Sequence, residues 1–387
     1  MRIGIDGTLL HGRYSGVEYS IHHLLHALAR CDAENEFVVY VPAGFQPDRD
    51  FPPSFTWHYT SFPGRRRLRR IFWQQCQLPR QLVRDGVDIH HGPGYIIPLR
   101  CPVPAVVTVY DIIALTHPRL CRLANFLHYR WALPRVLRRA ARVIVPSESV
   151  KDDIVRLFPE TAPRLRVVPL GIDEVYFHPI KDETAKRVRA KFALPERFIL
   201  FIGNLEKKKN LRMLIEVFGD LKARHAIPHH LVLAGCLRTA TADLHHAIQN
   251  VSDNNSIHLL DYVPQEDLPA LYRAAEVFVL PSLVEGFGLP VLEAMALGTP
   301  VVASNRGALP EVVADAGLLC DPEDPQSLRE ALLRLINDQH LRLRLSEAGN
   351  KRAQEFTWKK TAEQVISIYR EVYIEHCATK EECRTGA

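Results

Sequence analysis

The sequence predicts an α/β protein built from two doubly wound parallel-sheet domains in tandem. Short β-branched runs alternate with longer amphipathic stretches along most of the chain, as expected for parallel strands joined by crossover helices. The 387 residues correspond to about two to three ordinary domains. Hydrophobic residues make up 47% and charged residues 24%, close to globular averages, so disorder or coiled coil is not expected.

The first half carries five strand candidates, each a short apolar run. They are Arg2–Asp6, Phe37–Val41, Asp88–His91, Ala105–Tyr110 and Val143–Pro146. The stretch from Glu18 to Ala29 has apolar residues at helical spacing, which predicts the first crossover helix. A break follows at Pro169–Pro179, where Gly171 and two prolines indicate a linker.

The alternation restarts after this linker. The second set of strand candidates is Phe198–Ile202, Leu231–Ala234, Ile257–Leu260, Val277–Leu280 and Val301–Ala303. We assign residues 1–172 to a first domain and 173–360 to a second. The last helical stretch, about Thr361–His376, is compatible with either domain, and a helix over about 361–387 can pack back on the first. Doubly wound sheets bind ligands at the carboxyl ends of their strands, so the active site is expected in a cleft between the domains.

Positive charge is concentrated in the first half of the chain. Residues 1–170 hold 23 Lys+Arg against 14 Asp+Glu, a net of +9, whereas the whole chain has a net of +5. Five arginines account for much of this excess and directly precede Ile71, Phe72 and Trp73: Arg65, Arg66, Arg67, Arg69 and Arg70. This pattern suits an anionic membrane surface. It is equally compatible with a solvated loop beside a helix that packs inward. No nucleic-acid motif accompanies the arginines, so nucleic acid is not an expected partner.

The location of the protein follows from what the sequence lacks. No apolar run approaches the roughly 18 residues that a membrane span needs. The N-terminus opens with Arg2 and a short strand pattern rather than a signal peptide. Eight cysteines are scattered without the spacings of zinc sites or disulfide scaffolds. We therefore expect a cytoplasmic protein with reduced thiols.

The most informative segment is Pro281–Pro300, PSLVEGFGLPVLEAMALGTP. A strand ends at Leu280, a loop with glycines follows, and Pro290 stands where the first turn of a helix tolerates proline. The amides of Gly288 and Leu289 would face an anion at the helix start. Glu285 and Glu293 bracket this turn, and carboxylates of this kind accept hydrogen bonds from sugar and ribose hydroxyls. The alternative for Glu293 is an exposed helix position.

A second group is the lysine run Lys207, Lys208 and Lys209, which follows the strand that ends near Gly203. Fixed positive charge stabilises a departing nucleoside diphosphate. The alternative is a solvated turn before the helix that begins near Leu211. Lysines at a helix start are slightly unfavourable for the helix dipole, which favours the functional interpretation.

Two further groups bear on metal binding. His90 and His91 are adjacent at the end of a strand candidate, so they point to opposite faces and joint ligation is not expected. Asp48–Arg49–Asp50 is the one D-x-D triplet, but it lies in a Pro-flanked loop and is interpreted as solvated. We therefore predict no metal site and no cofactor.

These motifs resemble retaining glycosyltransferases of the GT-B fold, and specifically glycosyltransferase family 4. The E-x7-E spacing of Glu285 and Glu293 is the family signature. The resemblance extends to five further runs: ALPEVVADAGLL, GNLEKKKN, HLLDYVPQEDLPALY, VPLGID and SGVEYSIHHLLHAL. It spans nearly the whole chain in the family's order. The expected fold is therefore GT-B, two Rossmann-like domains with an interdomain cleft.

The resemblance implies roles for individual residues. Glu285 would bind hydroxyls of the donor sugar, Glu293 the ribose, and amides near Phe287, Gly288 and Leu289 the sugar and diphosphate. Lys209 matches a family lysine. Asn204 replaces the family's arginine, so Lys208 or Lys207 would supply part of the missing charge. The run His258–Pro264, with Val263, would border the base.

In the first domain the resemblance is less complete. The loop at Gly16 would let backbone amides approach the donor phosphate and the acceptor. The family's His-Asp pair is Tyr110–Asp111 here, which leaves Asp111 to face the reacting centre, although it can instead cap the following turn. The loop at His91–Gly94 resembles one that lines the acceptor side.

The implied activity is a metal-independent, retaining transfer of a hexose from a UDP-, GDP- or ADP-sugar. The expected acceptor is a glycan or lipid-linked glycan in cell-surface polysaccharide synthesis, reached at the inner face of the membrane. Two alternatives stay open: an epimerase or phosphorylase on the same fold, and a non-catalytic nucleotide-sugar-binding subunit. A Rossmann dehydrogenase is disfavoured because no G-x-G-x-x-G follows the first strand.

Overall fold

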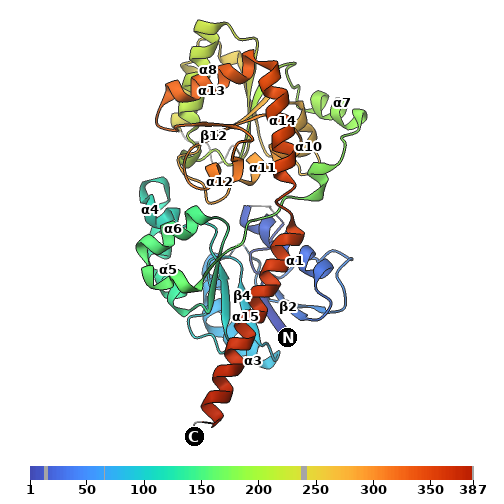
Figure 1. The fold of residues 1–387 in the computed structure, drawn as a ribbon, viewed down its shortest axis with the longest axis vertical. Helices are drawn as coiled ribbons and strands as arrows, with labels where there is room; N and C mark the ends of the chain where they lie inside the picture. Colours follow the sequence, from blue (N-terminus) through green and yellow to red (C-terminus); the bar gives the residue numbers. More distant parts are fainter. Residues whose placement is uncertain (13–15, 65, 237–241, 386–387) are drawn as a thin grey trace. The chain divides into compact units, whose positions relative to one another are not determined.

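The computed structural model describes residues 1–12, 16–64, 66–236 and 242–385. The chain forms two compact units, each built on its own parallel sheet (Figure 1). The first unit comprises Met1–Gly171 and Trp358–Ala387, and the second is Ile172–Thr357. Both units have the strand order of doubly wound α/β sheets.

The sheet of the first unit has seven strands in the order β3-β2-β1-β4-β5-β6-β7. All neighbours pair in parallel. The strands are β1 (Arg2–Asp6), β2 (Glu36–Val41), β3 (Phe55–Tyr59), β4 (Ile89–Gly92), β5 (Ala105–Thr108), β6 (Arg142–Val145) and β7 (Leu165–Val167).

The sheet of the second unit has six strands in the order β10-β9-β8-β11-β12-β13, again all parallel. The strands are β8 (Phe198–Ile202), β9 (His230–Ala234), β10 (Ile257–Leu260), β11 (Val277–Leu280), β12 (Val301–Ser304) and β13 (Leu318–Cys320). The central strands are almost wholly apolar and buried, because helices cover both faces of a doubly wound sheet.

The crossovers are helical. The α-helices are α1 (Gly16–Cys31), α2 (Arg67–Phe72), α3 (Leu78–Arg84), α4 (Ile113–Thr116), α5 (Leu123–Arg139), α6 (Glu148–Leu157), α7 (Asp182–Lys191), α8 (Leu211–His225), α9 (Ala242–Gln249), α10 (Leu268–Ala274), α11 (Leu289–Ala296), α12 (Leu309–Val313), α13 (Pro325–Asn337), α14 (Gln339–Ala353) and α15 (Trp358–Thr385). A π-helical turn, Trp73–Gln77, joins α2 to α3. The 3₁₀ turns are Pro118–Leu120, Pro159–Arg164, Glu174–Phe177, Lys207–Lys209 and Asn254–Ser256.

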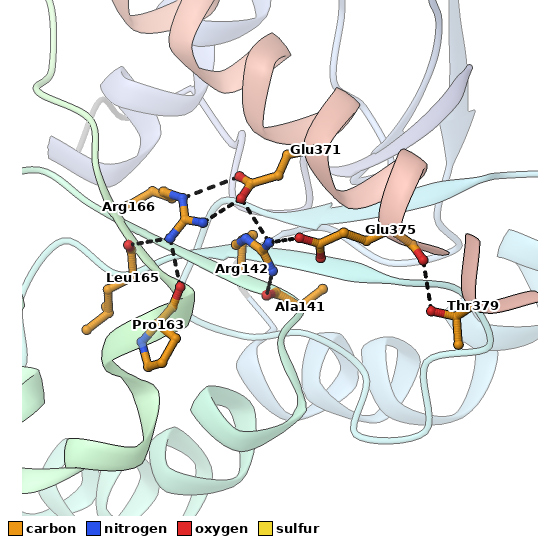
Figure 2. Close-up of polar contacts among 8 residues, drawn as sticks. All are labelled: Ala141, Arg142, Pro163, Leu165, Arg166, Glu371, Glu375 and Thr379. Atoms are coloured by element: carbon orange, nitrogen blue, oxygen red, sulfur yellow. Dashed lines mark hydrogen bonds and ion pairs between the residues drawn. The ribbon is translucent and has the colours of Figure 1, made fainter. Parts of the chain in front are cut away.

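The C-terminal helix α15 belongs to the first unit, where it packs on α1 and β4 (Figure 1). An arginine–glutamate network fixes it to the sheet (Figure 2). Glu371 accepts hydrogen bonds from Arg142 of β6 at 2.9 Å and from Arg166 of β7 at 2.5 Å, and Glu375 also pairs with Arg142. A shared, two-sided guanidinium–carboxylate arrangement holds a helix more firmly than isolated surface ion pairs do. The chain therefore returns to its first unit at its end.

α15 is long, but it is not a membrane span. Within the part of the chain that the structure describes, no helix combines the length and the apolar composition that crossing a bilayer requires.

In each sheet the strand that comes first in the chain, β1 or β8, lies in the interior. The chain adds its next strands on one side of that strand and later strands on the other side. In the second unit this switch point lies between the neighbouring strands β8 and β11. Doubly wound sheets bind ligands at the carboxyl ends of the strands that flank such a point. The lysine run follows β8 and the Glu285 loop follows β11, so the topology brings both motifs to one edge.

Candidate functional site

Lys209 and Glu285 form a buried ion pair at this edge of the second unit. The Lys209 Nζ atom donates to Glu285 Oε1 at 2.5 Å, and both residues are only 9% exposed. The two loops are also joined through their backbones, because Leu283 N–H donates to the Lys208 carbonyl at 2.8 Å. The lysine run therefore contacts the E-x7-E segment directly, and Lys209 is not a solvated turn residue.

The pair keeps Glu285 ionised. Burial alone would raise its pKa, but the charges of Lys209 and Lys208 outweigh burial and hold the pKa below its ordinary value. Two ammonium groups beside one carboxylate leave a surplus of positive charge. A lysine ammonium has three N–H donors, so Lys209 can hold Glu285 and still bond to an anion.

Two glycines shape the loop around Glu285. Gly307 has φ of 61°, and a Cβ on it would lie 2.4 Å from the Glu285 carbonyl oxygen. That carbonyl accepts the Ala308 N–H at 3.1 Å. Gly288 has φ of 110°, and a Cβ there would lie 2.5 Å from the Leu309 side chain. Only glycine fits these two positions without a rearrangement of the loop.

Glu293 lies on α11 and is held by two tyrosines. Tyr272 Oη donates to Glu293 Oε2 at 2.7 Å, and Tyr176 also hydrogen-bonds to this carboxylate. Glu293 is 8% exposed, so it is not a surface helix position. Burial raises its pKa to about 7, against the opposing effect of the two hydroxyls, and Asp173 adds to the increase. Glu293 is therefore poised between its charged and neutral forms at neutral pH.

Sequence reasoning missed both tyrosines. Tyr176 lies in a 3₁₀ turn, Glu174–Phe177, within the segment interpreted as a linker, yet its ring is buried and contacts Tyr272 with centroids 6.1 Å apart. Tyr272 lies on α10 in a run that carried the family resemblance without an assigned role. The adjacent aromatic pair Tyr176–Phe177, unusual for a solvated linker, was the available signal.

The other expected donor-site residues of the second unit differ in exposure. Val263 and Phe287 are buried. The Phe287 ring packs edge-on against Phe356 with centroids 5.9 Å apart, so its amide rather than its ring is the group available at the loop. Gly288 caps the N-terminus of α11, which Leu289 begins. Asn204 is exposed.

In the first unit, Asp111 adopts the capping arrangement. Its Oδ1 accepts the Ile113 N–H at 3.1 Å, and its Oδ2 accepts the Tyr95 hydroxyl at 3.2 Å. Gly16 is the first residue of α1, and a Cβ there would meet nothing within 4 Å. Gly16 is therefore not a sterically restricted position, in contrast to Gly288 and Gly307 of the second unit. Tyr14 and Ser15 of the same loop lie outside the described residues.

The two adjacent histidines of β4, His90 and His91, are structural. His91 is fully buried and hydrogen-bonds to Tyr369 of α15 at 2.6 Å and to Thr108 of β5 at 2.9 Å. His90 instead contacts the Gly4 carbonyl at 3.0 Å. Burial lowers the pKa of His91 to about 3, so its ring is neutral at physiological pH. The two rings serve different neighbours, as alternation along a strand requires.

The described arginines of the cluster differ in exposure and in their hydrogen bonds. Arg66 and Arg69 are exposed, whereas Arg67 donates to Asn125 of α5 at 2.7 Å and Arg70 to the Gly64 carbonyl at 3.1 Å. Arg65 lies outside the described residues. Phe72 is 60% exposed, but Trp73 is buried in the core. Trp73 therefore packs inward and takes no part in any surface that the arginines form.

Two family models match the chain, one for each half. The model described as Glycosyltransferase Family 4 matches residues 14–175. The model described as Glycosyl transferases group 1 matches residues 182–352.

Curated relatives include two kinds of sugar transferase. The O-antigen chain mannosyltransferase B of Escherichia coli is 34% identical over 290 residues, which cover 74% of this chain and 76% of that protein. The D-inositol 3-phosphate glycosyltransferase of Corynebacterium jeikeium (strain K411) is 32% identical over 247 residues, covering 62% of this chain. The match spans 59% of the length of this second relative.

Solved structures show the same fold. Sucrose-phosphate synthase from Thermosynechococcus elongatus aligns with a TM-score of 0.78 at 22% identity, over 97% of this chain and 100% of that one. Anabaena Alr3699/HepE in complex with UDP and glucose aligns with a TM-score of 0.73 at 19% identity, over 96% and 100%. The predicted GT-B fold of two Rossmann-like domains is confirmed. The chain belongs to glycosyltransferase family 4 and is a hexosyltransferase that uses a nucleotide-sugar donor.

Proposed function

We propose that the protein transfers a hexose, with retention of configuration, from a nucleoside-diphospho-hexose to a hydroxyl of a glycan or lipid-linked glycan in cell-surface polysaccharide synthesis. The observation that carries this proposal is the buried Lys209–Glu285 pair beside Lys208, at the carboxyl ends of β8 and β11. A net positive charge fixed next to an ionised carboxylate suits a ligand that joins a diphosphate to a sugar.

The lysines serve the leaving group. When the bond between the sugar C1 and the diphosphate oxygen breaks, the electron pair stays on the diphosphate, and its negative charge increases. Lys209 and Lys208 stabilise that charge without any reorganisation, since the protein has already fixed their positions. The acceptor oxygen bonds to C1 on the same face, and its proton passes to the departing phosphate oxygen. This scheme needs no protein nucleophile and no metal ion.

The carboxylates and amides hold the donor. Glu285, which stays ionised, accepts hydrogen bonds from hydroxyls of the donor hexose, and Glu293 accepts the ribose hydroxyls. The amides at Gly288 and Leu289, at the start of α11, bind the diphosphate. Asn204 and Val263 border the nucleotide.

The first unit supplies the acceptor side in this proposal. Gly16, at the start of α1, lets backbone amides approach the donor phosphate. Asp111 is assigned to the reacting centre, and a variant decides whether that role adds to its capping of the turn. Asp111→Asn keeps the cap geometry, so a loss of turnover with an unchanged thermal midpoint supports the assignment, and unchanged turnover contradicts it.

A panel experiment tests the activity. Wild-type protein is combined with UDP, GDP, ADP and their hexose conjugates, and the thermal midpoint is measured. We expect one base to stabilise the protein and its hexose conjugate to support transfer. Sugar release that depends on inorganic phosphate would indicate a phosphorylase, isomerisation of the donor an epimerase, and binding without transfer a non-catalytic subunit.

Chelation tests the metal-independent chemistry. With the donor and acceptor identified, EDTA is expected to leave the transfer rate unchanged. Loss of activity in EDTA that manganese restores would contradict this part of the proposal.

We place the protein at the inner face of the cytoplasmic membrane, docked through α2 and the N-terminal part of α5. The Arg67–Asn125 hydrogen bond joins these helices, and both present large apolar side chains to solvent. The exposed apolar residues are Leu68, Phe72, Leu123, Leu127 and Trp131. The exposed arginines around them are Arg66, Arg69, Arg122, Arg130 and Arg135. Exposed apolar and basic side chains on neighbouring helices favour an anionic bilayer surface.

Vesicle sedimentation tests this docking surface. Each arginine near an anionic membrane contributes about 1 kcal/mol, so the wild type should pellet with anionic vesicles at low salt and be released at high salt. The Arg66→Ser, Arg69→Ser double variant spares the arginines that contact Asn125 and Gly64, and it should pellet less. The matched control is Arg212→Ser, Arg224→Ser in the second unit. Equal recovery of all three proteins in the supernatant would favour a soluble acceptor.

A further inference from the structure

A cluster of two histidines and an aspartate lies in the first unit, outside every group assigned above. His22 and His26 are four residues apart on α1 and so share one face of this helix. Asp48 lies in the loop that follows β2 (Figure 1 labels both elements). His22 Nε2 and His26 Nε2 lie 3.2 Å and 2.9 Å from the same atom, Asp48 Oδ2. Asp48 is therefore not simply solvated, although the sequence predicted a solvated D-x-D triplet.

We propose that His22, His26 and Asp48 bind a divalent transition-metal ion of the zinc class, a site that the transfer reaction does not use. The three ligand atoms all lie within 4.8 Å of one another. Zinc bonds to imidazole nitrogen and carboxylate oxygen at about 2.0–2.2 Å, so neighbouring ligands in a tetrahedral site are about 3.3 Å apart. The two nitrogen–oxygen distances, 3.2 and 2.9 Å, are hydrogen-bond distances slightly shorter than that spacing. The three side chains thus already converge and need only a small outward shift to hold an ion.

The ligand types select the metal. Two imidazoles with one carboxylate suit zinc and neighbouring transition metals, whereas magnesium and calcium prefer shells made of oxygen.

The loop that carries Asp48 is held in place by aromatic packing. The Phe51 ring lies 4.5 Å from the His26 ring and 4.9 Å from the Trp57 ring, centroid to centroid. Phe45 contacts Trp57 from the other part of the loop, at 5.6 Å. A metal site needs ligands that are positioned before the ion arrives, and these contacts provide that support.

A cavity adjoins the cluster and leaves room for a further ligand. It encloses about 300 Å³, and its lining includes His22 and Asp48 together with His11 and Glu18. The side chains of His22 and His26 are about a quarter exposed and that of Asp48 is more than half exposed. An ion on these three ligands keeps a fourth position for water or for an oxygen ligand in the cavity, which is the pattern of zinc sites with an open position.

The geometry also explains what the ion would do for the fold. His22 and His26 come from α1, and Asp48 comes from the loop that joins β2 to the edge strand β3. An ion shared by the three would fix this loop to α1. It would therefore stabilise the folded first unit as well as bind there, which gives the site two independent readouts.

The test uses the full chain, freed of any histidine tag and of bound metal. Zinc is titrated against a chromophoric competitor, and the thermal midpoint is measured with and without Zn²⁺. The wild type should bind one zinc ion per chain tightly and become more stable. His26→Gln and Asp48→Asn should each weaken binding by more than about 100-fold, beyond the range for losing an outer-shell partner, and remove the stabilisation.

Matched controls separate this site from general histidine binding. Asp50→Asn changes the other aspartate of the same loop, and His225→Gln removes an exposed histidine from α8 in the second unit. Both controls should bind zinc as the wild type does, and Mg²⁺ or Ca²⁺ in excess should not displace it. The proposal is overturned if the wild type binds no zinc, or if His26→Gln and Asp48→Asn retain wild-type affinity. Metal-free midpoints show whether each variant is folded.

Discussion

The two buried glutamates of the motif, Glu285 in a loop and Glu293 on α11, have pKa values shifted in opposite directions. Both residues are less than a tenth exposed. Glu285 faces ammonium groups, and its pKa lies below the ordinary value. Glu293 faces hydroxyl groups, and its pKa is about 7. The nine residues Glu285–Glu293 thus hold one carboxylate that stays ionised and one that titrates near physiological pH.

The difference shows how one motif divides two tasks. Burial penalises both carboxylates, and the partners decide the outcome. A charged partner offsets the desolvation and fixes the anion beside the reacting sugar. Hydroxyl partners orient the carboxylate but offset little of its charge, so Glu293 gains most when a ligand supplies further hydrogen bonds. We expect turnover to depend on the charge of Glu285. We expect nucleotide binding to depend on pH, through the protonation state of Glu293.

The largest effect is expected from removing the charged partner. Lys209→Ala should lower turnover by about 10² to 10³, the range for losing one preorganised stabiliser of developing charge. It should also lower the free energy of unfolding, by up to about 3 to 5 kcal/mol, because it removes the hydrogen-bonded charged partner of the buried Glu285 carboxylate. Steady-state kinetics and denaturant unfolding measure the two effects.

Two variants sharpen this result. Lys207→Ala changes an exposed neighbour in the same run and should cost little stability. The double variant Lys209→Ala, Glu285→Ala should be destabilised by less than the sum of its single changes, since the pair is then removed together. Additive losses would mean that the two residues do not stabilise each other.

A smaller effect of opposite sign is expected at Glu293. Its folded pKa of about 7 exceeds the ordinary value of 4.5, so its contribution to stability is present below pH 4.5 and is lost as pH rises through 7. Glu293→Gln has no such loss. Relative to wild type, it should therefore gain up to about 3 kcal/mol between pH 5 and pH 8, taken as an upper bound.

Thermal or denaturant unfolding at several pH values measures this gain. A constant difference between wild type and Glu293→Gln across that range would show that the buried carboxylate does not titrate there. Glu285→Gln serves as the contrast, because it should destabilise the protein throughout the range.

The smallest effect concerns the hydroxyls. Tyr272→Phe removes the 2.7 Å hydrogen bond to Glu293, and this bond favours the charged form. The pKa of Glu293 should rise by up to about one unit, since a single hydrogen bond contributes about 1 kcal/mol. Nucleoside diphosphate binding should weaken as the pH falls and Glu293 becomes protonated. The midpoint of this loss should therefore move to higher pH in the variant. Tyr59→Phe changes an exposed ring of the first unit and should leave this midpoint unchanged.

The interior strands were predictable because their signal is local. β1, β8 and β11 coincide with the expected ranges, as their buried apolar runs end at polar or turn residues. The edge strand β10 also coincides with its expected range, because its partly buried run is still mostly apolar. The strands that the sequence did not reveal are β3, β7 and β13, and all three lie at sheet edges. An edge strand is short and partly exposed, so its pattern resembles that of a loop.

The candidate site was predictable where one motif carried it. Glu285, Glu293 and Lys209 were identified from the E-x7-E spacing and the lysine run, and the structure joins Lys209 to Glu285. The tyrosines that hold Glu293 were not identified. Tyr176 is more than 100 residues from Glu293 in the sequence, and only the folded structure shows that its hydroxyl reaches Glu293 on α11. The same holds for Asp48 and the α1 histidines, which lie more than 20 residues apart along the chain.

The division of labour between the two glutamates is tested most directly by calorimetry of the nucleoside diphosphate that the panel selects. Binding is measured for wild type, Glu285→Ala and Glu293→Ala at pH 8, where Glu293 is ionised. Glu293→Ala should lose about 2 to 5 kcal/mol of binding free energy. Glu285→Ala should bind the diphosphate, which lacks the sugar, nearly as well as wild type does, while its turnover is greatly reduced. Wild-type diphosphate affinity in Glu293→Ala would contradict the assignment.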